Sequence, residues 1–140
     1  VESARRVLAA SKPTLVPIAV TVETALHRQD LERLRRGGPV ARLIARQAEA
    51  FAQDEGLAER YRPTCPALPD DFINFLHDPL AAAIALDWRD GVAIDDVRLR
   101  NEVIDGWLVQ TPDGGGTPAH VVRRIDGAAF DRHWLDAVAG

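Results

Sequence analysis

The chain has 140 residues, enough for one domain with a buried core, and its 46% hydrophobic and 27% charged residues are ordinary for a globular protein. A net charge of −4 argues against nucleic acid as a partner, and no apolar run reaches the roughly 20 residues that a membrane span needs. The single cysteine, Cys65, excludes an internal disulfide and a cysteine-based zinc site, so we expect a cytoplasmic protein without nucleic-acid or membrane partners.

The first third of the chain alternates between helical and strand-like patterns. Residues 2–10 place Ala4, Val7 and Leu8 on one face of a helix. Residues 14–22 form a short apolar run that predicts a strand buried on both faces, although Pro17 counts against a central position in a sheet. A helix followed by a buried strand is typical of an α/β architecture, and we expect the sequence to begin partway through one.

Two helices are predicted next. Residues 30–36 form a short helix that Gly37 and Gly38 end, and Pro39 then occupies the first turn of a longer helix that runs to about Gly56. Apolar residues recur along this longer helix at helical spacing and form one stripe: Val40, Leu43, Ile44, Ala48 and Phe51.

The middle of the chain is rich in proline. Residues 61–71 contain three prolines and predict a loop, and Asp70 and Asp71 at its end are expected to cap a helical stretch over residues 72–76. A further helix is expected over residues 80–86.

After Gly91 the hydrophobic period changes to two, which is typical of half-buried strands. Asp105-Gly106 predicts a two-residue hairpin turn, and a last strand over residues 120–125 precedes a final helix over residues 128–138. The elements together predict an α/β fold with a mixed sheet and flanking helices, in a single domain over residues 1–140.

The segment His77-Asp78-Pro79 is the strongest candidate for a functional site. Asp78 stands where a helix N-cap belongs and Pro79 at the first helical position, so a purely structural capping role for Asp78 is one interpretation. A functional interpretation is also open, because a carboxylate held rigidly at a helix start can bind a hard cation such as Ca²⁺. His77 directly precedes this carboxylate as a candidate proton donor, and upstream aromatic residues could cover a flat ring: Tyr61, Phe72 and Phe75.

Residues 75–87, FLHDPLAAAIALD, are similar to the HDPLA motif of the inosine-uridine preferring nucleoside hydrolase family. Residues 16–51 resemble the PLDVT…PVA stretch that precedes this motif in the family, and residues 2–10 resemble its DPEAARIVL helix. The strands from Val97 onward and residues 125–135 resemble the C-terminal end of the family. The resemblance therefore covers nearly the whole chain in order, with HDPLA as its most specific part.

The resemblance implies the C-terminal half of a Rossmann-like nucleoside hydrolase fold. Such enzymes hydrolyse the N-glycosidic bond of ribonucleosides to ribose and free base with a Ca²⁺-bound water, and they serve purine and pyrimidine salvage. Asp78 matches the Ca²⁺ ligand of the motif, and His77 matches the histidine that protonates the leaving base.

The chain departs from the family in what it lacks. The N-terminal DTDxGxDD signature, which supplies the other Ca²⁺ carboxylates, is absent, and Ala19 replaces the aspartate of the family's DVT. We therefore expect residues 1–140 alone to be inactive, and to associate with the missing N-terminal half or as a homo-oligomer. The alternative is a non-catalytic nucleoside-binding or regulatory module that kept the fold.

Overall fold

The computed structural model describes residues 1–66 and 68–140, so residue 67 of the expected loop over residues 61–71 lies outside the described residues. The chain divides into two compact units. The first contains Val1–Val20 and Gly91–Ile125, and the second contains Thr21–Asp90 and Asp126–Gly140. The expectation that residues 1–140 form a single domain, the C-terminal part of a longer enzyme, stays a prediction.

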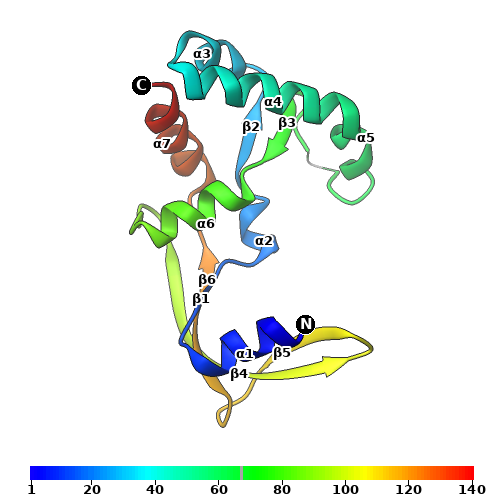
Figure 1. The fold of residues 1–140 in the computed structure, drawn as a ribbon, viewed down its shortest axis with the longest axis vertical. Helices are drawn as coiled ribbons and strands as arrows, with labels where there is room; N and C mark the ends of the chain where they lie inside the picture. Colours follow the sequence, from blue (N-terminus) through cyan, green and yellow to red (C-terminus); the bar gives the residue numbers. More distant parts are fainter. Residues whose placement is uncertain (67) are drawn as a thin grey trace. The chain divides into compact units, whose positions relative to one another are not determined.

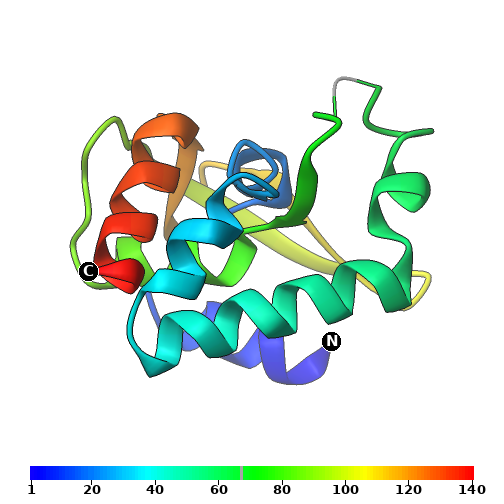
Figure 2. The ribbon, with the colours of Figure 1, turned by 90° about the horizontal axis from the view of Figure 1, so that it is seen from above.

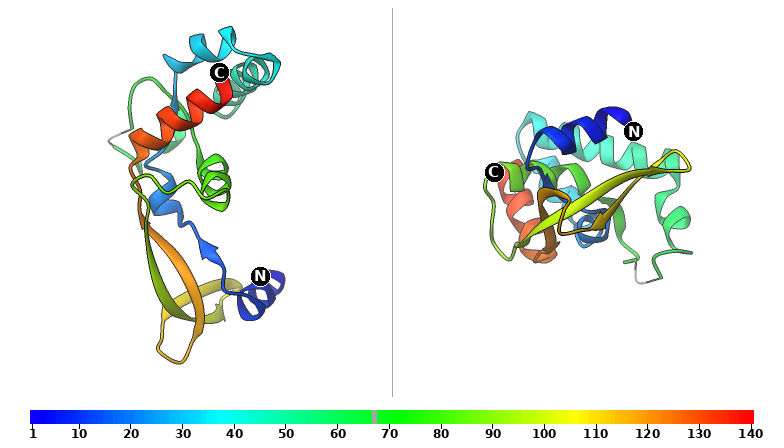
Figure 3. Two further views of the ribbon diagram at one scale, coloured as in Figure 1. Left: turned by 90° about the vertical axis from the view of Figure 1, so that its left-hand side faces the viewer. Right: turned by 90° about the horizontal axis from the view of Figure 1, so that it is seen from below.

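The first unit is built on a four-stranded mixed sheet with the strand order β1-β6-β4-β5 (Figure 1). Strand β4 (Ala93–Ile104) pairs antiparallel with both β5 (Trp107–Pro112) and β6 (Thr117–Arg124). Figure 3 shows β4 and β6 running side by side as the longest pair of this unit. The short strand β1 (Thr14–Leu15) adds to β6 in parallel, and helix α1 (Glu2–Ala10) contacts β6.

The hairpin predicted at Asp105-Gly106 is confirmed. Ile104 and Trp107 are paired across the turn, and the two turn residues have φ angles of 50° and 82°. Positive φ at both central positions is the geometry that the twist of a two-residue hairpin requires, and glycine adopts it without steric cost.

The buried strand predicted over residues 14–22 is wrong beyond its second residue. Only Thr14–Leu15 is extended, Thr14 is exposed, and the chain turns into the short helix α2 (Ile18–Thr21). Pro17 has no N–H to donate to a sheet, and its carbonyl instead accepts the N–H of Val20. The prolyl ring therefore ends the strand and begins a helical turn.

The second unit contains the helices α3 (Asp30–Arg36), α4 (Pro39–Glu55) and α5 (Leu57–Tyr61), which follow one another in Figure 2. The predicted bounds of α4 are confirmed. Pro39 lies in its first turn, where the missing N–H costs nothing, and Gly56 ends it with a left-handed φ of 54°.

The apolar stripe of α4 is only partly buried. Val40 is 67% exposed, Leu43 47% and Phe51 46%, whereas the fully buried positions of α4 are Ala41 and Ala45. A small residue is buried at Ala41 because the backbone at Gly37 lies close to it. A Cβ atom placed on Gly37 would lie 2.7 Å from the Cβ atom of Ala41. Helical period predicted the helix, but the apolar face is left largely open within the described residues.

The helix predicted over residues 72–76 is also wrong. Phe72–Phe75 is strand β3, which pairs antiparallel with β2 (Ala25–His27), a strand that the sequence did not reveal. Asp70 and Asp71 therefore cap no helix. Asp71 instead contacts His27, with 3.0 Å between Oδ1 and Nδ1. A four-residue apolar run has no period long enough to separate a strand from a helix, and the partner strand decides.

Two more helices complete the second unit. Helix α6 (His77–Ala85) confirms the helix expected over residues 80–86 and begins earlier. Helix α7 (Gly127–Ala139) confirms the final helix, and its cap Asp126 accepts the N–H of Ala129 at 2.9 Å. The α/β class with a mixed sheet and flanking helices is thus confirmed. No helix in the described part of the chain combines the length and apolar character that crossing a membrane requires.

Candidate active site

The start of α6 is fixed by the β2–β3 pair. Ala25 is paired with Phe75. The pairing continues one residue further, where the N–H of Leu76 donates to the carbonyl of Thr24 at 3.2 Å. The pairing of β2 with β3 therefore fixes the position of the residue that precedes α6, Leu76. Thr24 is fully buried, so the point of entry lies in the core of the second unit.

His77 is the first residue of α6 and is held by two neighbours. Its Nδ1 lies 2.6 Å from the hydroxyl oxygen of Thr21, which is 4% exposed. Its ring also lies 5.2 Å, centroid to centroid, from the ring of Phe75. Hydrogen bonding at Nδ1 leaves Nε2 as the ring nitrogen that can exchange a proton with another group.

Asp78 lies in the first turn of α6 and is exposed. The helix begins at His77 with Leu76 at the N-cap position and no side-chain cap, so the predicted placing of Asp78 as the cap is wrong. Across residues 1–66 and 68–140, the carboxylate of Asp78 makes no hydrogen bond or ion pair. Both of its oxygens are consequently open to a ligand, and its charge is favoured by the positive end of the helix dipole.

His77 and Asp78 line the same cavity of about 910 Å³ in the second unit. That volume lies within the range of roughly 300–1,000 Å³ that is usual for small-molecule sites. Its walls come from β3, α4, α5 and α7, and they include Phe75, Tyr61 and Trp134. The cavity thus joins one imidazole, two carboxylates (Glu55 and Asp78) and several aromatic rings.

The three aromatic residues expected to cover a ring do cluster, but they do not share one role. Ring centroids are separated by 5.3 Å between Tyr61 and Phe75 and by 4.7 Å between Phe72 and Phe75. Phe72 is 3% exposed and packs with Leu68 in the core, while Tyr61 and Phe75 reach the cavity of His77. Phe72 therefore supports the wall rather than forming it.

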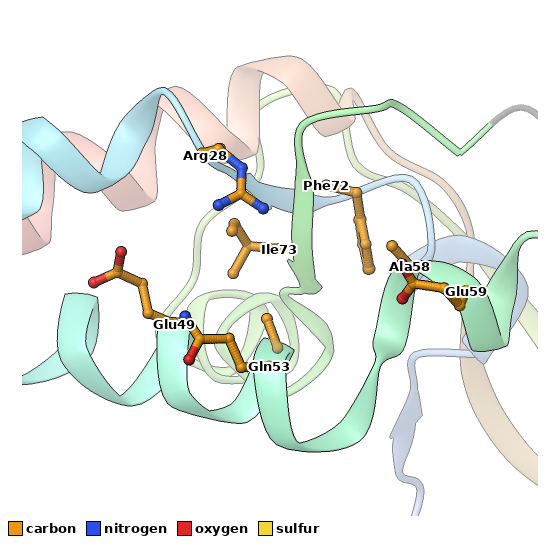
Figure 4. Close-up of a pocket in the computed structure, with 8 residues that line it drawn as sticks. Arg28, Glu49, Gln53, Ala58, Glu59, Phe72 and Ile73 are labelled. Atoms are coloured by element: carbon orange, nitrogen blue, oxygen red, sulfur yellow. The ribbon is translucent and has the colours of Figure 1, made fainter.

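A second cavity, shown in Figure 4, lies between α4, α5 and β3 and has a different character. Its volume is about 130 Å³, well below the usual range for a small-molecule site. Arg28, Glu49 and Glu59 are among its lining residues, so its charges are mixed and exposed near the surface. A water or a small ion suits this space, and a nucleoside does not.

One titratable group of the second unit has a strongly shifted pKa, and it lies outside the cavity of His77. Burial raises the pKa of Asp131, on α7, to about 6, opposed by a hydrogen bond that Ala25 N–H donates to its carboxylate at 3.2 Å. Asp131 thus ties α7 to β2, and its ionised form is the costly one.

Replacing Asp131 with asparagine is expected to stabilise the protein only at higher pH. The folded pKa of about 6 lies above the ordinary 3.8, so the favourable contribution of the protonated acid is complete below pH 3.8 and is lost as pH rises through 6. Asp131→Asn keeps an oxygen for Ala25 N–H without the charge and should gain about 1–2 kcal/mol at pH 8, allowing for partial exposure. Urea unfolding at pH 8 and below pH 4 measures this, and an equal gain at both values would contradict the assignment.

Sequence reasoning missed Thr21 as a member of this site. The His77-Asp78 pair is contiguous and could be found by motif, but Thr21 is 56 positions away from His77 in the chain. Only the unrecognised β2–β3 pairing brings the two together. The one available signal was the likeness of residues 16–51 to the family's PLDVT stretch, whose threonine Thr21 matches.

Neither the models of known protein families nor the curated proteins match this chain. Among solved structures it is similar to a plant nucleoside hydrolase, with a TM-score of 0.66, 17% sequence identity and a match that covers 93% of this chain. The match covers 42% of the plant chain, so this chain spans less than half of its length. The likeness shows that residues 1–140 have a nucleoside hydrolase-like fold.

Proposed function

We propose that this chain is part of a nucleoside hydrolase of the inosine-uridine preferring family and contributes His77 and Asp78 to its active site. The reaction is hydrolysis of the N-glycosidic bond of a ribonucleoside to ribose and free base, a step of purine or pyrimidine salvage in the cytoplasm. The observation that carries the proposal is geometric. His77 and the exposed carboxylate of Asp78 line one cavity with Tyr61 and Phe75, in a fold similar to that of a nucleoside hydrolase.

In this proposal His77 is the general acid. As the bond between the ribose carbon and the base nitrogen breaks, its electron pair goes to the base, and Nε2–H of His77 donates a proton to the base. The oxygen of a water bonds to the oxocarbenium-like ribose carbon and gives up a proton to a base from outside these residues, so that ribose and the neutral free base result. Phe75 and Tyr61 supply apolar surface against which a planar base can pack.

The proposed calcium ion is only partly provided for by these residues. Calcium takes six to eight oxygen ligands. In the described ranges, residues 1–66 and 68–140, no group of three or more His, Cys, Asp or Glu side chains could hold a metal. The residues present therefore do not make a calcium site by themselves. Asp78 is proposed as one ligand, to be completed by groups from outside this chain.

Residues 1–140 alone are accordingly expected to bind Ca²⁺ no more tightly than an isolated surface carboxylate does, and to leave nucleosides intact. One carboxylate cannot replace the water shell of the ion. Isothermal titration of Ca²⁺ into the chain measures this directly. A micromolar dissociation constant would show that a complete site exists within these residues.

The alternative is a non-catalytic module that binds nucleosides or regulates another protein while keeping the fold. It is favoured by Ala19 and by the lack, among the described residues, of the further carboxylates that a calcium site needs. The two functions differ in product: the polypeptide that carries this chain would release free base from inosine if the first holds, and would bind inosine unchanged if the second holds. Association with a further half of the enzyme, or between copies, is part of the same proposal and would cover the exposed positions of α4.

A further inference from the structure

Thr21 is held firmly at the point where it meets His77. Its carbonyl accepts both the N–H of Thr24 at 3.2 Å and the hydroxyl of Thr24 at 2.8 Å. Thr24 in turn accepts the N–H of Leu76, the residue next to His77. A closed circuit of hydrogen bonds therefore links the backbone at Thr21 to the backbone at the start of α6.

Packing alone does not decide which nitrogen of His77 points where. The ring of Phe75, tilted by 34° and 5.2 Å away, restricts the plane of the imidazole. A half-turn of that imidazole about its bond to Cβ keeps the plane but exchanges Nδ1 with a carbon, and it moves Nε2 to the other edge. Only a polar partner distinguishes the two orientations, and Thr21 is that partner at 2.6 Å.

We propose that Thr21 is a positioning residue for His77: its hydroxyl selects the ring orientation and the tautomer, so that Nε2 is the nitrogen presented for proton exchange. In this proposal the hydroxyl donates its hydrogen to Nδ1, which keeps the ring proton on Nε2. The inference deepens the proposed function and rests on it for its chemical meaning, but the positioning is a property of the chain that is measurable without turnover.

The test is the ring ¹⁵N spectrum of His77 in the 140-residue chain, labelled at histidine, at a pH at which the ring is neutral. The His77→Ala variant assigns the signal. One tautomer gives two well-separated ring nitrogen resonances, and a mixture brings them together. We expect well-separated resonances in the wild type, a shift of both toward each other in Thr21→Val, and return to the wild-type positions in Thr21→Ser, which restores the hydroxyl.

Thr117→Val is the control. It removes a part-buried threonine hydroxyl in the first unit, where that hydroxyl donates to the carbonyl of Leu99 at 3.2 Å and takes no part in holding Thr21 or His77. It is expected to leave the two ring resonances where they are, with circular dichroism showing that every variant is folded. Unchanged resonances in Thr21→Val, or an equal shift in Thr117→Val, would overturn the proposal. If Thr21→Val does not fold, a spectrum that shows a mixture of tautomers in the wild type or in Thr21→Ser would overturn the proposal.

Failure of this inference and failure of the proposed function give different results. If Thr21 selects the tautomer but the enzyme carrying His77→Ala turns over nucleosides normally, the positioning stands and the acid role of His77 falls. If His77→Ala loses activity but Thr21→Val leaves the ring nitrogens unchanged, the acid role stands and Thr21 is not its positioning residue.

Discussion

If Asp78 is the proposed metal ligand, replacing it with alanine in the polypeptide that carries this chain should lower kcat/KM by about 10³-fold or more on every nucleoside, since a bound metal would supply several kcal/mol of transition-state stabilisation. The loss should be uniform, because a metal ligand in this proposal acts at the ribose and not at the base. Stability should change little, because the side chain of Asp78 caps no helix and is exposed. The measurements are kcat/KM on inosine and uridine, with the melting temperature of each protein.

A true helix cap provides the matched control for Asp78. Asp126 accepts the N–H of Ala129 at 2.9 Å at the start of α7, so Asp126→Ala should cost about 1 kcal/mol of stability and keep kcat/KM. The purely structural interpretation of Asp78 predicts that both variants behave alike. A modest and similar loss in Asp78→Ala and Asp126→Ala would therefore remove Asp78 from the site.

Replacing His77 with alanine is expected to slow hydrolysis according to how much the leaving group needs a proton. General acid catalysis is worth roughly 10²- to 10⁴-fold, so inosine and uridine should lose rate in that range. A nitrophenyl riboside, whose leaving group departs without protonation, should be largely spared. Steady-state kcat/KM of the variant and the wild type on all three substrates measures the contrast.

His133 provides the control for the loss of an imidazole. It is exposed, stacks on Trp88 with ring centroids 5.9 Å apart, and does not line the cavity of His77. His133→Ala should therefore leave the rate on all three substrates unchanged. If His77→Ala loses as much on the nitrophenyl riboside as on inosine, His77 is not a leaving-group acid and its contacts with Thr21 and Phe75 are structural.

The sequence predicted those elements whose ends are set by residues with distinctive backbone properties. Pro39 and Gly56 delimit α4 because one lacks an N–H and the other tolerates positive φ, and Asp105-Gly106 encodes its hairpin in two residues. The short apolar runs over residues 14–22 and 72–76 were assigned wrongly. Their structure is decided by Pro17 in the first case and by pairing with Ala25–His27 in the second, and neither follows from local periodicity.

The candidate site could be predicted from sequence only where it is contiguous. His77 and Asp78 are neighbours, and helix α6 presents both to one cavity. Thr21, which is hydrogen-bonded to His77, is brought to the site only by the tertiary structure. The same holds for the residues of α4 and α7 that line the cavity. The stripe on α4 illustrates the same limit, because periodicity shows which face is apolar but not what lies against it.

His77 and Asp78 are proposed to act together in the cleavage of a nucleoside, and release of free base from inosine tests this proposal most directly. Chromatography of the reaction over time measures hypoxanthine, with the polypeptide that carries this chain compared with its His77→Ala, Asp78→Ala double variant. We expect hypoxanthine and ribose in equal amounts from the wild type and no release above background from the double variant. Intact inosine with the wild type, or equal release by the two proteins, would contradict it.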